Sequence, residues 1–143
     1  MRNLLFEPVF DASSEKIWEI VKDVNNYSNY IEFCQKSELF GDFREGSHWI
    51  DHSTVAFVPM DIKHEIIKIV PQKEIIYKIN LPSGGALWQK FYFEPLGERT
   101  KLRIEIEINF TNKLVDALIG QVIYRRNQIM IETTINNFKK GLS

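Results

Sequence analysis

The histidines are the first residues whose type and spacing could support chemistry. His48 and His52 lie four positions apart with Asp51 between them, and His64 follows in the next apolar segment. Zinc needs three or four ligands close together, whereas residues four apart along one strand are ~13 Å apart. We therefore expect no metal site, although a single histidine remains a candidate acid or base because its pKa lies near neutrality. If Trp49 faces the interior, alternation along the strand turns His48 and His52 to solvent.

Arg126 is the second candidate for chemistry. It lies between Val122 and Ile129 at helical spacing, next to an apolar stripe that we expect to be buried. There it either holds a ligand carboxylate, phosphate or carbonyl group inside the protein or reaches water with its stem on the apolar face. The first role needs a ligand acid or a nearby glutamate, because a buried charge without a partner is too costly.

Other catalytic templates are missing from the sequence. It contains no GxSxG, P-loop, GxGxxG, HExxH or CxxC motif. Gly84-Gly85, after Pro82-Ser83, is typical of a turn or a flexible lip rather than of a phosphate-binding loop. Cys34 is the only cysteine, which excludes an intramolecular disulfide and a four-thiolate zinc site. We predict no metal, no cofactor and no catalytic residue.

Composition and charge bound the class of protein. Hydrophobic residues make up 44% of the 143 residues and charged residues 26%, which is typical of one globular domain with a genuine core. The net charge of −1 gives no general attraction to nucleic acid or to an anionic membrane. The first apolar run breaks at Glu7 and Pro8, and no apolar stretch approaches the ~18–20 residues of a membrane span. We expect a cytoplasmic protein without stable membrane insertion.

The pattern of apolar residues predicts the order of the elements. We expect a first strand over residues 3–10, a short helix capped by Ser13, and a short irregular helical turn over 27–33. Turn signals then separate about six strands between residues 34 and 110. The clearest of them, 101–110, has one apolar and one polar face, which indicates an antiparallel sheet that is wet on one side.

The last segment returns to helical spacing. Residues 114–140 lack proline, and a helix of this length is ~40 Å long, which is enough to cross a whole sheet. We expect its apolar stripe to face the sheet; the stripe comprises Val115, Leu118, Ile119, Val122, Ile129 and Thr133, flanked by Ile123 and Met130.

These elements predict an α+β fold. A curved antiparallel sheet of about seven strands wraps around the long C-terminal helix, with two short helices after the first strand. Space that side chains leave between sheet and helix would be an apolar cavity of the kind that hosts small molecules. Aromatic residues either wall such a cavity or fill an ordinary core, and as a group they favour the cavity. The sheet contributes Trp49, Phe57, Tyr77, Phe91 and Phe93, and the helix contributes Ile119, Val122 and Ile123.

Three loose motifs, taken in order, resemble a known family. They are Phe10-x-Ala12-Ser13-x-Glu15-x-Ile17-Trp18, Gly46-x-x-Trp49 and Glu94-Pro95-Leu96-Gly97-x-x-Thr100. With the long last helix they resemble the START-like (SRPBCC) superfamily, which includes polyketide cyclases and lipid-transfer domains. The resemblance covers essentially the whole chain and implies a helix-grip fold, as a single START-like domain over residues 1–143.

The segment from Tyr27 to Cys34 resembles, more narrowly, the coenzyme Q-binding and ribosome-association-toxin branch of that superfamily. Its aromatic residues and Cys34 are in register with the Tyr-Pro-x-Phe-Leu-Pro-Trp-Cys pattern of the branch, but Ser28 and Glu32 replace the two prolines. This resemblance implies quinone as one ligand among many. It also adds Phe33 to the candidate ligand-binding residues.

We predict that the protein binds or carries a hydrophobic or amphipathic small molecule, lipid- or polyketide-like, in the cavity between sheet and helix. Arg126 and Tyr77 are the candidates for polar recognition. One alternative is a polyketide cyclase/dehydratase-like enzyme, which needs a titratable group inside the cavity, with Tyr77, His64 and Glu65 as candidates. A second alternative is a quinone-binding or ribosome-associated interaction protein. The sequence assigns no oligomeric state.

Overall fold

The computed structural model describes residues 1–55, 57–81 and 84–142. Two short strands, a helix and a 3-10 helix come first: β1 (Arg2–Phe6), β2 (Val9–Phe10), α1 (Ser14–Lys22) and η1 (Val24–Asn29). Six strands follow: β3 (Cys34–Phe40), β4 (His48–Val55), β5 (Val58–Val70), β6 (Glu74–Asn80), β7 (Ala86–Leu96) and β8 (Arg99–Asn109). The chain ends in a helical segment made of α2 (Lys113–Val115), the π-helical turn η2 (Asp116–Gly120) and α3 (Gln121–Leu142).

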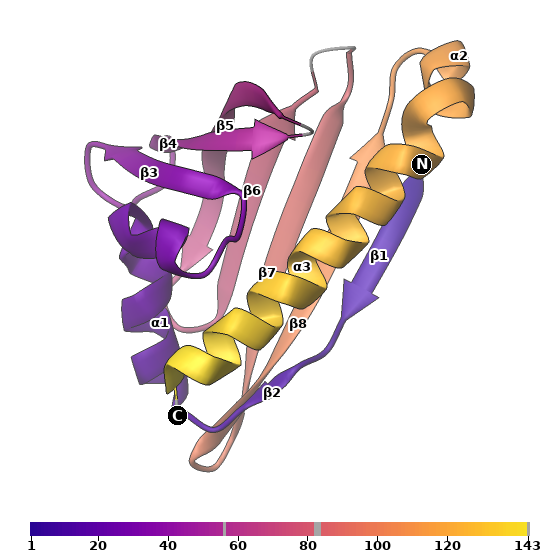
Figure 1. Ribbon diagram of the computed structural model, residues 1–143. Coiled ribbons are helices and arrows are strands. Elements are labelled where there is room, and N and C mark those ends of the chain that lie inside the picture. The colour runs from indigo at the N-terminus through magenta and orange to yellow at the C-terminus, as the bar shows by residue number, and fades with distance from the viewer. Residues whose placement is uncertain (56, 82–83, 143) are drawn as a thin grey trace.

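The strands form one eight-stranded antiparallel sheet. Their order is β1-β8-β7-β6-β5-β4-β3, and β2 also pairs with β8. The long helix α3 runs diagonally along one face of the sheet, in front of β7 and β8, with its C-terminal end near α1 (Figure 1). The predicted α+β helix-grip architecture is therefore confirmed, including the two short helical elements after the first strands and the six strands that follow them.

The inner face of the sheet, which α3 covers, is defined by strand alternation. In β8 the residues Leu102, Ile104, Ile106 and Ile108 are all buried, as the sequence pattern predicts. Directly opposite residues in antiparallel strands point to the same face. Gln89 of β7 pairs with Ile106, and Tyr77 of β6 pairs with Gln89, so both residues lie on this same face.

The C-terminal half of α3 is docked by specific contacts. The Phe138 ring lies edge-on to Phe10, with centroids 5.1 Å apart, and tilted against Tyr30, at 5.3 Å. The side-chain amide of Asn137 donates a hydrogen bond of 2.9 Å to the Tyr30 carbonyl oxygen. Ile131 is the buried side chain of α3 within the described residues.

The predicted rotation of the helix is wrong. Val122 and Ile129, expected to face the sheet, are 54% and 63% exposed, and Leu118 and Ile119 are exposed too. The N-terminal half of the helix carries apolar residues on both faces, so the spacing alone allowed either rotation. The contacts of Phe138 and Ile131 fix the rotation, and the π-helical turn shifts the phase of every residue before it.

The π-helical turn is built around Arg2 of β1. The Arg2 guanidinium donates to Asp116 Oδ1 at 2.9 Å and to Gln121 Oε1 at 2.9 Å, so it spans the turn. A Cβ atom at Gly120 would overlap Asp116 Oδ1 and lie 2.7 Å from Arg2 Nε. Glycine at this position therefore lets the first strand hold the start of the long helix.

Within the described residues, no helix is both long enough and apolar enough to span a membrane.

Candidate functional site

A connected aromatic cluster occupies the inner face of the sheet. The Trp49 ring of β4 stacks on His64 of β5, with centroids 4.5 Å apart and planes at 9°. Tyr77 of β6 stands edge-on to Trp49 at 4.5 Å and contacts Phe91 of β7 at 5.5 Å. The structure thus brings together three of the aromatic residues proposed from the sequence and adds a histidine to them. Phe93 also faces inward, where it contacts Trp18 of α1 at 5.6 Å.

Two buried hydrogen-bond donors in this cluster lack a well-formed hydrogen bond. Neither Trp49 Nε1 nor the Tyr77 hydroxyl finds an acceptor in good geometry among the described residues, and the Tyr77 hydroxyl lies beside that of Tyr27. The neighbouring Tyr27, by contrast, donates its hydroxyl proton to the Val21 carbonyl oxygen. Burial raises the pKa of Tyr77 well above its usual value, so this phenol stays protonated and remains a donor. A buried donor without a good hydrogen bond lowers the free energy of unfolding by ~1–3 kcal/mol. This applies to both Trp49 and Tyr77 on the inner face.

A buried polar group adjoins the aromatic cluster. Asp51 Oδ1 accepts a hydrogen bond of 2.6 Å from Ser37, and Asp51 Oδ2 lies 3.8 Å from His64 Nδ1. His64 Nδ1 also lies 3.3 Å from the Ile62 carbonyl oxygen, which assigns the ring proton to Nδ1 and leaves Nε2 as the basic atom. Burial lowers the pKa of His64, so the ring is neutral at pH 7.

Sequence reasoning missed Asp51 and Ser37 as inner-face residues. The signal was present, because Asp51 lies two positions from Trp49 and therefore on the same side of β4. Ser37 pairs directly with Asp51 across β3 and β4. Cys34 lies 3.4 Å from the Ser37 hydroxyl, and burial raises the pKa of its thiol, which leaves it a poor nucleophile.

Exposure along the inner face of β5 shows where the interior opens. Alternate residues pair with the inner face of β4, from Val58 at the turn to Ile66 in the centre. Their exposed fractions fall from 57% at Val58 and 37% at Met60 to 7% at His64 and 1% at Ile66. The inner face is therefore accessible at the β4–β5 turn and closed at the aromatic cluster.

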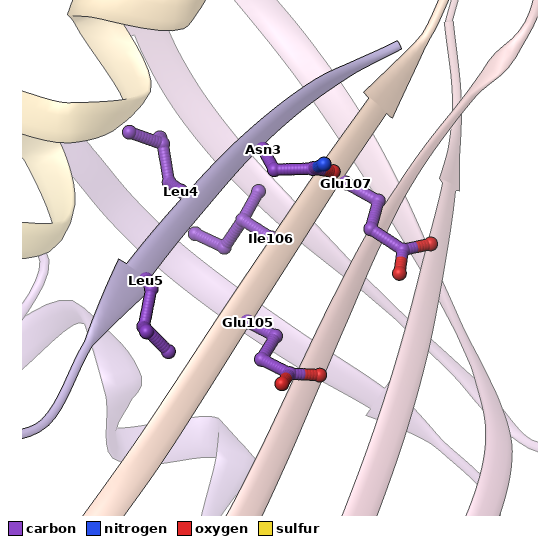
Figure 2. A pocket seen from close by; sticks show the side chains of 6 residues that line it. All are labelled: Asn3, Leu4, Leu5, Glu105, Ile106 and Glu107. Carbon is purple, nitrogen blue, oxygen red and sulfur yellow. The ribbon is translucent and has the colours of Figure 1, made fainter.

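Two hollows of the described residues lie away from the aromatic cluster, so neither is the open cavity expected from the sequence. One hollow, of about 270 Å³, lies at β1 and β8 and is lined by Asn3, Leu4, Leu5, Glu105, Ile106 and Glu107 (Figure 2). The other, of about 310 Å³, is lined by Val9, Asp11, Arg99, Lys139 and Leu142. Neither contains the aromatic cluster, because neighbouring side chains close over Trp49 and Tyr77.

The structure leaves five proposed site residues outside this cluster. Phe57 is 99% exposed, because it lies at the β4–β5 turn with a φ of 67° and no element covers it. Phe33, just before β3, is 55% exposed. The other three lie on the outer side of the helical segment for the rotational reason given above: Ile119, Val122 and Arg126. Arg126 therefore reaches water, whereas Ile123 is partly buried and packs against the core.

The remaining titratable candidates lie on the outer face. His48 pairs with Glu65 across β4 and β5, and its ring stacks on Phe40 at 4.9 Å. His52 contacts Asp61 at 2.6 Å and Glu38 at 3.0 Å, and these two carboxylates raise its pKa. The prediction that both strand histidines point away from Trp49 is confirmed. Within the described ranges, no three His, Cys, Asp or Glu side chains gather closely enough to hold a metal ion.

Comparison with known proteins decides the family. The family model described as "Polyketide cyclase / dehydrase and lipid transport" matches residues 7–142. The chain belongs to this family. No curated protein sequence matches the chain.

Several solved structures share the fold of this chain at low sequence identity. A START superfamily protein from Mycobacterium smegmatis is 15% identical, with a TM-score of 0.70 over 98% of this chain and 96% of that one. An aromatase/cyclase from Streptomyces sp. R1128 is 16% identical, with a TM-score of 0.72 over 94% and 92%. The di-domain ARO/CYC BexL of the BE-7585A biosynthetic pathway is 14% identical, with a TM-score of 0.77. This chain, 97% of which aligns, spans 47% of that protein's length.

Proposed function

We propose that the protein binds a hydrophobic or amphipathic small molecule between the inner face of the sheet and the N-terminal half of α3. The observation that carries the proposal is the fall in exposure along β5, which leads from an accessible apolar surface at Val58 to the buried aromatic cluster. Membership of a family that includes lipid transport supports the same function. We place this binding in the cytoplasm, in one START-like domain.

The N-terminal half of α3 is held less firmly than the C-terminal half, so a ligand can displace it. From Gln121 to Met130 the helix has no buried side chain, whereas its C-terminal half is held by Ile131, Asn137 and Phe138. Displacing the N-terminal half therefore uncovers only partly buried apolar side chains, which are Ile123, Tyr124 and Met130. Covering ~300 Å² of ligand surface contributes ~7 kcal/mol before association costs, at ~25 cal/mol per Å². Binding by local opening is thus energetically reasonable for this fold.

A matched pair of helix variants tests this location. Ile123→Trp is expected to lower the affinity for an apolar ligand at least tenfold, because the added bulk fills the space that the ligand would occupy. Val122→Trp adds the same bulk on the outer side of α3, where Val122 is 54% exposed, and is expected to leave the affinity unchanged. A panel of long-chain lipids, quinones and alkylnaphthalenes, measured by native mass spectrometry and equilibrium dialysis, supplies the ligands. Absence of any binding tighter than micromolar, or equal effects of the two variants, would overturn the proposal.

A second candidate function is a dehydratase of the cyclase type. His64 favours it, because a neutral, buried imidazole with a free Nε2 lies beside two unpaired donors. Nε2 would take a proton from the carbon next to a ketone, and the donors would stabilise the enolate oxygen. As the C=C bond forms, the β-hydroxyl leaves with the proton returned by His64, and the products are an enone and water.

Turnover of a β-hydroxy ketone tests the dehydratase candidate. The enone product absorbs in the ultraviolet, and its rate of formation is expected to fall as the pH drops below 6.5 through the lowered pKa of His64. The sign follows from the mechanism, since only the neutral ring acts as the base. His64→Gln is expected to remove the activity, and an unchanged rate in that variant would exclude His64 as the base. The outer-face variant His48→Gln is the control.

A further inference from the structure

We infer that this site selects ligands whose polar end is an uncharged hydrogen-bond acceptor, above all a carbonyl oxygen, and that it rejects carboxylates. The inference rests on the proposed function and specifies which ligands that site accepts. Its basis is the chemistry that is present and the chemistry that is missing around Trp49 and Tyr77.

What is present is a pair of unsatisfied donors. Indole Nε1 can only donate, and the raised pKa of Tyr77 keeps its hydroxyl protonated. The two rings lie 4.5 Å apart on the inner face, and neither polar atom makes a well-formed hydrogen bond among the described residues. A ligand oxygen that reaches either atom satisfies a group that the unliganded protein leaves unpaired. A hydrocarbon of the same shape has no acceptor atom, so it adds no hydrogen bond to either donor.

What is missing is a positive charge. The buried polar residues of the described chain are Ser37, Asp51, Ser53, His64, Gln89 and Thr100, with no lysine or arginine among them. His64 stays neutral at pH 7 because burial lowers its pKa. Arg126, the arginine considered for a role inside the cavity, is exposed.

A carboxylate is therefore a poor ligand despite its acceptor oxygens. An ionised group that leaves water without a countercharge loses more in solvation than two neutral donors restore. Asp51, whose carboxyl oxygen Oδ2 lies 3.8 Å from His64 Nδ1, brings acidic oxygens rather than a countercharge to this region. A ketone, ester or quinone keeps the hydrogen bonds and avoids this penalty.

Three ligands of nearly the same shape test the inference. They are 2-acetylnaphthalene, 2-isopropylnaphthalene and 2-naphthoate, with dissociation constants measured by equilibrium dialysis at pH 7.5. We expect the ketone to bind at least tenfold more tightly than the hydrocarbon and at least a hundredfold more tightly than the carboxylate. Equal binding of all three would overturn the inference while leaving the proposed function in place. Binding of none would overturn the proposed function itself.

Tyrosine variants show whether the donors cause the selectivity. Tyr77→Phe removes an unpaired hydroxyl, so we expect it to weaken ketone binding about fivefold to tenfold and to leave hydrocarbon binding unchanged. Its urea midpoint should change little, because this hydroxyl makes no well-formed hydrogen bond in the free protein.

Tyr92→Phe is the matched control for this substitution. Tyr92 pairs with Arg103 across β7 and β8 on the outer face of the sheet, so the preference for the ketone should stay. Trp49→Phe is the second test of the donor pair and should reduce the same preference. Ketone selectivity that survives in both Tyr77→Phe and Trp49→Phe would contradict the inference.

Discussion

Gly85→Ala is expected to lower the free energy of unfolding by about 3–5 kcal/mol, because it combines backbone strain with overlap against a fixed backbone. Gly85 follows the turn between β6 and β7 and has a φ of 101°, a conformation that residues with a side chain rarely adopt. Its added Cβ would overlap the carbonyl oxygen of Asn109 and lie 2.9 Å from Phe110 Cα. Neither atom can move without shifting the end of β8.

Gly97→Ala is the matched control for this substitution. Gly97 has a φ of 67°, but a Cβ there would meet nothing within 4 Å. We expect this variant to lose only about 1 kcal/mol, which is the cost of the backbone conformation alone. Thermal unfolding measures both, and at ~2–4 °C per kcal/mol the Gly85 variant should melt about 10 °C lower. Equal losses would show that the close approach to Asn109 is not the cause.

Ile131→Ala is expected to cost about 2–4 kcal/mol, since it opens a cavity at the buried side chain of α3. Ile131 is 8% exposed and belongs to the core that α3 shares with the sheet. Loss of this contact loosens the part of the helix that holds its rotation. The proposed binding site depends on that rotation, because it decides that Ile123 rather than Val122 faces the sheet.

Ile129→Ala tests the rotation directly. Ile129 is 63% exposed, so the same chemical change should alter stability by no more than ~0.5 kcal/mol. Urea unfolding of the two variants separates the helix rotation seen in the structure from the one expected from the sequence. A larger loss in the Ile129 variant than in the Ile131 variant would show that the helix packs through its other face.

The sheet was largely predictable from local patterns. Alternation places Leu102, Ile104 and Ile106 on one face whatever the rest of the chain does, because side chains on a strand alternate. The same rule places the side chain of Trp49 on the opposite face of the sheet from His48 and His52, and the structure confirms this. Turn residues such as Gly84-Gly85 marked the strand ends, since few other residues adopt their conformation.

The sequence by itself determined the fold class and the order of the elements, whereas the strand register of the structure placed Trp49 and Tyr77 on the inner face. Only the tertiary structure decided which side of the last helix meets the sheet, because its N-terminal half carries apolar residues on both faces and packing at Phe138 and Ile131 sets the rotation. That choice turned Arg126 out to water. The tertiary structure also placed Ser37, Asp51 and His64 together and left Trp49 and Tyr77 without well-formed hydrogen bonds. Contacts between separate strands depend on register and closure, which no local spacing specifies.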